Sequence, residues 1–110
     1  MNYSTVIDRL KDVAKIIRDN PRKSFPLWVF ELDFCSKELA DIHKRMSIEM
    51  GYYGKIKENI PHLKHLKEAI VRLSRLCAMG GLSFSVEVVF QTISSTIEDL
   101  KLQEKLDSER

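Results

Sequence analysis

Three histidines carry the side chains best suited to metal binding or acid–base chemistry. His62, His65 and Glu68 follow one another at steps of three residues, a spacing at which two helix side chains can hold one metal ion. On a helix, however, each residue turns by about 100 degrees, so the three side chains spread from the apolar edge to the basic face. The Glu-x-x-His pairs of di-iron bundles do not occur in the sequence. We therefore predict neither a metal site nor a cofactor.

The other titratable and nucleophilic side chains also lack the partners that catalysis requires. His43 follows Glu38 and Asp41, but Asp41 projects away from it on the same helix, which predicts a surface histidine. Cys35 and Cys77 fall within apolar stripes and have no CxxC spacing, so we interpret both as buried thiols. Neither GYYG nor MGGLS has the spacing of a phosphate-binding loop. The sequence therefore predicts no enzyme.

Positive charge gathers in one segment of the chain. The net charge of the 110 residues is only +2, but residues 55–75 carry six basic residues against two acidic ones. From residue 87 onward the balance reverses, with six acidic residues against three basic ones. Four cations share a helix face opposite the apolar stripe, where they could follow the phosphates of a nucleic acid: Lys57, Lys64, Arg72 and Arg75. Because Glu68 interrupts this row, nucleic-acid binding is the alternative rather than the leading hypothesis.

The segment FPLWVFELDF, residues 25–34, is apolar on more than one side. Its alternation of aromatic and acidic residues would suit a strand, but a seam at steps of three and four residues continues far beyond it and predicts a helix: Trp28, Leu32, Cys35, Leu39, Ile42 and Met46. A second apolar set falls on the opposite face: Leu27, Phe30, Phe34, Ile48 and Tyr52. A helix of one bundle buries a single stripe. This second face therefore predicts contact either with the N-terminal helix or with another protein chain.

Apolar periodicity predicts four helices, at about residues 4–19, 26–57, 61–79 and 83–105, followed by a frayed tail at 106–110. GYYG, residues 51–54, leaves two alternatives for the second helix, an end near Met50 or a continuation to about residue 57. We favour continuation, because the apolar spacing persists beyond the glycines. For residues 82–88 the alternative to a helix is a short strand paired with residues 30–34.

Composition and short connections complete the expected architecture. With 44% hydrophobic and 31% charged residues, the chain has the composition of one folded domain. Short connections place consecutive helices side by side and antiparallel, so the expected fold is an all-α, up-and-down four-helix bundle. No apolar run reaches the length of a membrane span and no signal peptide is visible, so we expect a cytoplasmic protein. The leading hypothesis is a non-enzymatic interaction protein, a homodimer or a binder of another protein.

Overall fold

The structure, a computed structural model, describes residues 3–19, 25–51, 60–79 and 86–109. Within these ranges every regular element is a helix: α1 (Ser4–Asp19), α2 (Phe25–Glu49), the short 3-10 helix η1 (Pro61–Leu63), α3 (Lys64–Met79) and α4 (Val86–Ser108). The predicted all-α bundle of four helices is confirmed.

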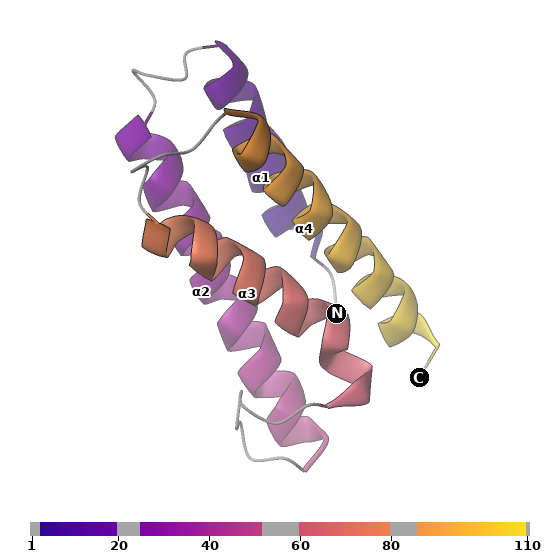
Figure 1. The fold of residues 1–110 in the computed structure, drawn as a ribbon. Coiled ribbons are helices and arrows are strands. Elements are labelled where there is room, and N and C mark those ends of the chain that lie inside the picture. The colour runs from indigo at the N-terminus through magenta and orange to yellow at the C-terminus, as the bar shows by residue number, and fades with distance from the viewer. Residues whose placement is uncertain (1–2, 20–24, 52–59, 80–85, 110) are drawn as a thin grey trace.

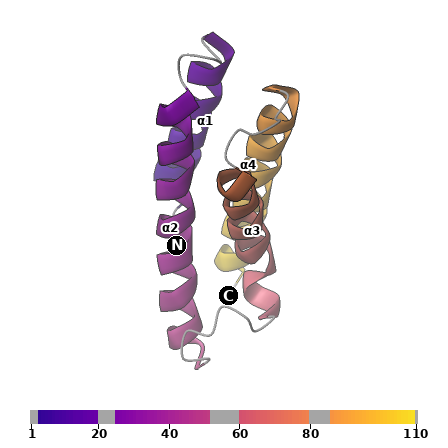
Figure 2. The ribbon, with the colours of Figure 1, turned by 60° about the vertical axis from the view of Figure 1, so that its left-hand side comes forward.

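The four helices form a closed ring in which each packs against its neighbours in the chain, and α4 returns to pack against α1. Figure 2 shows that α1 and α2 make one layer of the bundle and that α3 and α4 make the other. Helices α1 and α4 lie side by side, and so do α2 and α3 (Figure 1). The bundle measures 44 × 23 × 17 Å, because the helices run roughly along one common axis.

The core is built from the apolar stripes that the sequence predicts. All six seam residues of α2, from Trp28 to Met46, are at most 6% exposed. The other helices contribute fully buried side chains at the same periodic positions, among them Leu10, Leu66, Leu73, Ile93 and Leu100. Burial of these stripes, at about 25 cal/mol per Å² of apolar surface, holds the helices together far more than helix propensity does. Among the described helices, none has both the length and the apolar character needed to cross a bilayer.

The second helix ends earlier than predicted. α2 stops at Glu49, and Gly51 takes a left-handed conformation with φ of 88°. The Gly51 amide donates to the Ile48 carbonyl at 3.0 Å, which satisfies one of the carbonyls that a helix end leaves open. Glycine adopts this conformation without a Cβ clash, so it commonly terminates helices. The favoured continuation is therefore wrong at residues 50 and 51, whereas residues 52–57 lie outside the described residues.

The last helix differs from the prediction at its C-terminal end, whereas its predicted start at residue 83 lies outside the described residues. α4 begins at Val86, and residues 30–34 and 86–88 are helical, so the strand alternative is wrong for them. Residues 82–85 lie outside the described residues. At the other end, residues 106–108 form the last turn of α4 rather than a frayed tail.

Tyr3 forms hydrogen bonds with the end of α4. Its side chain is fully buried, and its hydroxyl donates to Oδ2 of Asp107 at 2.9 Å and lies 3.5 Å from Sδ of Met46. Its backbone amide donates to Oε1 of Glu104 at 3.0 Å. Tyr3, the residue before α1, therefore links the last two turns of α4 to α2.

Gln103 extends the same network to the start of α3. Its Nε2 donates to the His62 carbonyl at 2.6 Å and to Oδ1 of Asp107 at 2.9 Å, while its Oε1 accepts the Leu66 amide at 3.0 Å. The Leu66 amide belongs to the first turn of α3, where backbone donors have no partner within the helix. Gln103 is fully buried, and it acts as a cap supplied by a different helix.

Candidate functional site

Most of the predicted basic residues line an open pocket of about 530 Å³ along α3. Its apolar lining comes from Ile60, Pro61, Leu63 and Val71, its cations are Lys64, Lys67, Arg72 and Arg75, and His43 and Glu68 complete it. The pocket thus combines apolar surface with four cations and one carboxylate. We call it the α3 groove.

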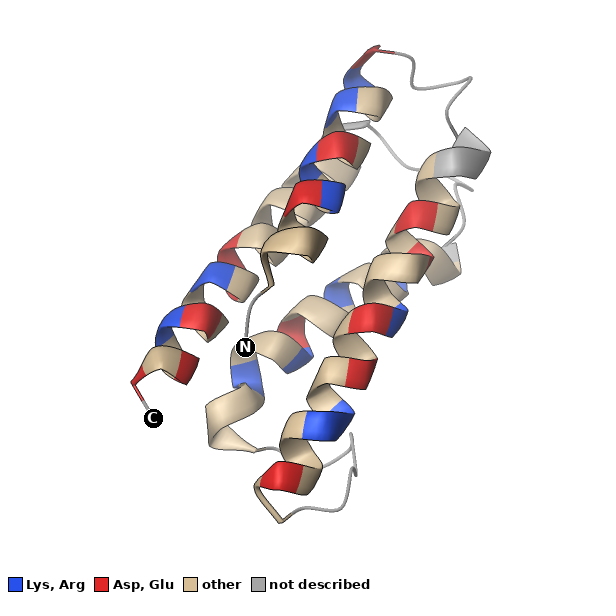
Figure 3. Cartoon of the chain, turned by 180° about the vertical axis from the view of Figure 1, so that it is seen from behind, with Lys and Arg blue, Asp and Glu red and all other residues tan. Residues whose placement is uncertain are grey.

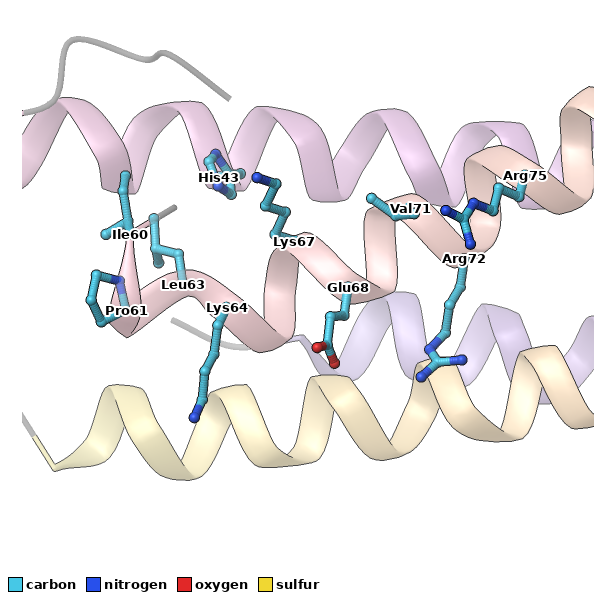
Figure 4. A pocket seen from close by; sticks show the side chains of 10 residues that line it. All are labelled: His43, Ile60, Pro61, Leu63, Lys64, Lys67, Glu68, Val71, Arg72 and Arg75. Atoms are coloured by element: carbon cyan, nitrogen blue, oxygen red, sulfur yellow. The ribbon is translucent and has the colours of Figure 1, made fainter. Parts of the chain in front are cut away.

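The groove contains three of the four cations predicted for nucleic-acid binding, namely Lys64, Arg72 and Arg75; Lys57 lies outside the described residues. Figure 4 shows Lys64, Glu68 and Arg72 directed toward α4, and Lys67 and Arg75 on the side of α2. Sequence reasoning missed Lys67, because its place in the groove depends on α2 lying beside α3. The cations flank the exposed face of α3 instead of converging on one point.

Arg72 forms an ion pair with an acidic residue of α4. Its Nε donates to Oδ2 of Asp99 on α4 at 2.8 Å. Burial raises the pKa of Asp99 above its ordinary value, and the hydrogen bond from Arg72 opposes that shift. The ion pair partly neutralises Arg72, so the groove offers less positive charge than the row of residues in the sequence indicates.

His65 and Glu68, which helix geometry predicts to point in different directions, lie close together. Donor atoms of His65, Glu68 and Asp99 all lie within 4.8 Å of one another, and Nδ1 of His65 is buried with no hydrogen-bond partner among the described residues. His62 is exposed and is not part of this cluster. A cation held there would compete with Arg72 for Asp99 and would meet the positive charges that line the groove. The arrangement favours the ion pair over a metal site.

His43 is buried, so the prediction of a surface histidine is wrong. The Ser47 hydroxyl donates its one proton to the His43 carbonyl at 2.7 Å. The 3.2 Å contact between Ser47 Oγ and His43 Nδ1 is therefore a bond that Nδ1 donates, which assigns the neutral tautomer with a lone pair on Nε2. Nε2 is buried and has no hydrogen-bond partner among the described residues.

The environment of His43 opposes its protonation. Burial, and after it the positive charge of Lys67, lower the pKa of His43 below its ordinary value. Figure 4 shows the Lys67 side chain directed toward the imidazole from α3. The folded state thus holds His43 neutral at a pH where the unfolded chain already binds a proton.

Because the pKa of His43 is lower in the folded chain than in the unfolded chain, we predict that acid lowers the free energy of unfolding. Between pH 7 and about pH 5 the unfolded chain takes up a proton at this histidine before the folded chain does, so the free energy of unfolding falls as pH falls. His43→Gln, which cannot titrate, should show a shallower decline than the wild type. Urea unfolding across this pH range measures both slopes. If stability fell equally with pH in the wild type and in His43→Gln, the lowered pKa of His43 would be contradicted.

The two cysteines have the properties of core residues. Cys35 is fully buried, Cys77 is partly buried, and both are free thiols. Burial raises the pKa of each thiol to about 11. Both are protonated at neutral pH, which is unfavourable for a nucleophile.

The aromatic face of α2 is open to solvent at its N-terminal end. Phe30 is 71% exposed and Phe34 is 42% exposed. Helix α1 leaves both rings exposed and contributes only Arg9 beside them. The guanidinium carbon of Arg9 lies 4.2 Å from the centre of the Phe34 ring. Its Nη1 lies 3.5 Å from Oε2 of Glu31. The predicted second face of the helix therefore faces outward at these two rings.

Ile48, another predicted member of that face, lies apart from the two rings. It is 50% exposed and follows Phe30 by 18 residues, or about 27 Å along the helix. Exposed Lys37 and Asp41 occupy the same helical face between them. The side chain of Leu27 and the whole of Tyr52 lie outside the described residues. Among the described residues, the aromatic surface thus reduces to Phe30 and Phe34 with Arg9 at its edge.

Comparisons of the chain with models of known protein families, with curated proteins and with solved structures find no match.

Proposed function

We propose that this protein is a non-enzymatic interaction protein whose contact surface is the outer face of α1 and α2 around Phe30 and Phe34. The observation that carries the proposal is the exposure of two phenylalanine rings one helical turn apart. Apolar surface left in water costs about 25 cal/mol per Å², and aromatic residues are enriched where proteins bind one another. An exposed aromatic pair on a rigid helix is therefore a natural centre for an interface.

A second copy of the same chain is the partner that the surrounding charges favour. Arg9 pairs with Glu31 and Lys37 pairs with Asp33 next to the rings, and the exposed Glu38 and Asp41 follow on the same side of α2, so the surface carries charges of both signs. Figure 3 shows acidic and basic residues interspersed along α1 and α2. A surface with charges of both signs can face its own copy across a twofold axis, with basic groups of one copy opposite acidic groups of the other. The expected assembly is a homodimer with the two α2 helices in contact.

Arg9 gives this interface a polar anchor. Its guanidinium group is oriented by both the Phe34 ring and the carboxylate of Glu31, so little side-chain freedom remains to be lost on association. Arginine stacked on an aromatic ring gains strength when water is removed from the pair. Formation of the dimer would remove that water.

Substitution of Phe30 tests the proposed dimer. In sedimentation equilibrium, Phe30→Asp should raise the dimer dissociation constant by about a hundredfold, because a symmetric interface contains each substitution twice and each lost aromatic costs more than 1 kcal/mol. Association of the wild type should change little with salt, because burial of the aromatic rings, which salt does not screen, is expected to drive it. The helical circular dichroism spectrum should be unchanged, since Phe30 is exposed.

Ile48→Asp is the matched control. It places the same charge on an exposed apolar position of the same helix, away from the two rings, and should leave the dimer intact. A wild-type protein that stays monomeric at high concentration would refute the homodimer. An equal loss of association in Ile48→Asp would show that the interface is not centred on Phe30.

A further inference from the structure

One end of the α3 groove is lined by a buried polar side chain that lacks a partner. His43 is fully buried, and its Nε2 has no hydrogen-bond partner among the described residues. The imidazole belongs to the lining of the groove. A buried acceptor without a partner costs free energy unless a donor reaches it. This end of the groove is therefore a candidate site for a ligand that brings the missing donor.

The proton on Nδ1 of His43 decides what kind of group can meet Nε2. Because Nδ1 donates to Oγ of Ser47, Nε2 carries a lone pair and can only accept a hydrogen bond. A carboxylate or a phosphate presents oxygen acceptors, which this lone pair repels. An anionic group is therefore disfavoured at this point, although cations line the groove.

Lys67 limits the choice further. Figure 4 shows its side chain extending from α3 toward the imidazole, so an ammonium lies at the same end of the groove as His43. The ammonium repels a cationic donor such as an amine. It has three N–H donors, so it can give one to a ligand while it keeps its other contacts. The group that suits both side chains is uncharged, donates one hydrogen bond and accepts another, as a single hydroxyl does.

The lining beside these two polar side chains is apolar. Ile60 is 4% exposed and Leu63 is 1% exposed, and the exposed Pro61 lies between them in the chain. Figure 4 shows all three at the same end of the groove as His43. An apolar body attached to the hydroxyl would remove this lining from water. A water molecule at Nε2 gains nothing from it, so the apolar lining favours a larger ligand.

From these contacts we propose that this end of the α3 groove binds an uncharged small molecule with a hydroxyl group on an apolar ring, a phenol in the simplest case. The hydroxyl donates to Nε2 of His43 and accepts a hydrogen bond from Nζ of Lys67, while the ring packs on Leu63 and Pro61. A phenol donates more strongly than an aliphatic alcohol because it is more acidic. The groove volume of about 530 Å³ is in the range of small-molecule sites.

Three related compounds test the role of the hydroxyl. The first is p-cresol, the second is its methyl ether, which keeps the ring and the oxygen acceptor but has no donor, and the third is p-toluate, which carries a negative charge. Titration of the ¹⁵N-labelled protein with millimolar p-cresol should shift the backbone resonances of Leu63 and Lys67. The ether should bind about fivefold more weakly, because it cannot donate to Nε2, and p-toluate should also bind more weakly than p-cresol.

The imidazole nitrogens of His43 report the same contact directly. In a long-range ¹H–¹⁵N correlation spectrum of the free protein, His43 should be neutral with its proton on Nδ1. Addition of p-cresol should move the Nε2 resonance upfield, as acceptance of a hydrogen bond does. The spectrum of His43→Gln lacks these signals and therefore assigns them. A proton on Nε2 in the free protein would overturn the proposal.

Lys67→Met tests the second polar partner. Methionine keeps much of the apolar length of lysine and removes the ammonium, so p-cresol should bind about fivefold more weakly. Lys101→Met is the matched control, because Lys101 is an exposed lysine of α4 outside the groove, and it should bind p-cresol like the wild type. The proposal would be overturned by the absence of groove shifts with p-cresol, by equal affinity for p-cresol and its ether, or by tighter binding of p-toluate. Equal weakening in the two lysine variants would also overturn it.

The phenol site and the proposed dimer fail separately. Phe30 and Phe34 lie on the outward face of α2, whereas His43 lies on the buried side of the same helix. Phe30→Asp should therefore bind p-cresol as well as the wild type does, and Lys67→Met should keep the self-association of the wild type. A monomeric wild type would remove the dimer and leave the phenol site intact. A groove that ignores p-cresol would leave the dimer intact.

Discussion

Replacement of Tyr3 with alanine is expected to lower the free energy of unfolding by about 4 kcal/mol, the loss that follows when a fully buried aromatic side chain is removed. Tyr3 is the only tyrosine among the described residues, and it fills the space between α2 and the end of α4 while its hydroxyl bonds Asp107. A small domain is stable by only about 5–15 kcal/mol. The substitution should therefore remove a large part of the stability of the bundle.

Urea unfolding followed by circular dichroism measures the effect of the Tyr3 substitution. Tyr3→Phe keeps the ring and removes only the hydroxyl, so it should cost about 1.5 kcal/mol, the contribution of one hydrogen bond to a charged group. The slope of unfolding against urea should be similar in all three proteins. A Tyr3→Ala variant within 1 kcal/mol of the wild type, on the order of an ordinary surface substitution, would mean that the N-terminus does not pack as described.

Gln103→Ala should lower the free energy of unfolding by about 3 kcal/mol, because it removes three hydrogen bonds at once and leaves the buried Leu66 amide without an acceptor. The Leu66 amide loses its acceptor, the His62 carbonyl loses its donor, and Asp107 loses one of two hydrogen bonds. An unpaired buried polar group costs more than the net gain from forming its bond. The first turn of α3 should loosen together with the end of α4.

Gln91 supplies the matched control for Gln103. It is the other glutamine of the chain, it lies on the same helix, and it is exposed, so Gln91→Ala should change stability by no more than about 0.5 kcal/mol. Combining Tyr3→Phe with Gln103→Ala should give a non-additive loss, since both side chains bond the carboxylate of Asp107. Equal effects of the two glutamine substitutions would show that the cap on α3 contributes little.

Residues Tyr3, Gln103 and His43 show why part of this architecture is hidden from sequence reasoning. Each is polar or terminal, so an apolar pattern does not predict its burial, even though Gln103 follows Leu100 by three residues on the buried stripe of α4. Tyr3 meets partners more than a hundred residues away, and Gln103 meets the start of α3 about forty residues earlier in the chain. Such burial depends on which helices become neighbours, and a local pattern does not contain that information.

The candidate surfaces divide in the same way. The exposure of Phe30 and Phe34, and the alignment of Lys64, Arg72 and Arg75, follow from positions on a single helix. The separation of Ile48 from the two rings follows from helix geometry as well, and it divides the apolar face predicted from the sequence. The inclusion of Lys67 and the pairing of Arg72 with Asp99 require α2 and α4 to lie beside α3.

The sequence by itself determined four amphipathic helices, their apolar stripes and the excess of outward aromatic and basic side chains. It could do so because helix periodicity and the exclusion of apolar surface from water act over one or two turns. The tertiary structure alone decided where α2 ends, which polar groups are buried, and which cations share the α3 groove. Those features depend on contacts between helices that are distant in the chain, or on a choice between two backbone conformations of Gly51 that differ little in energy.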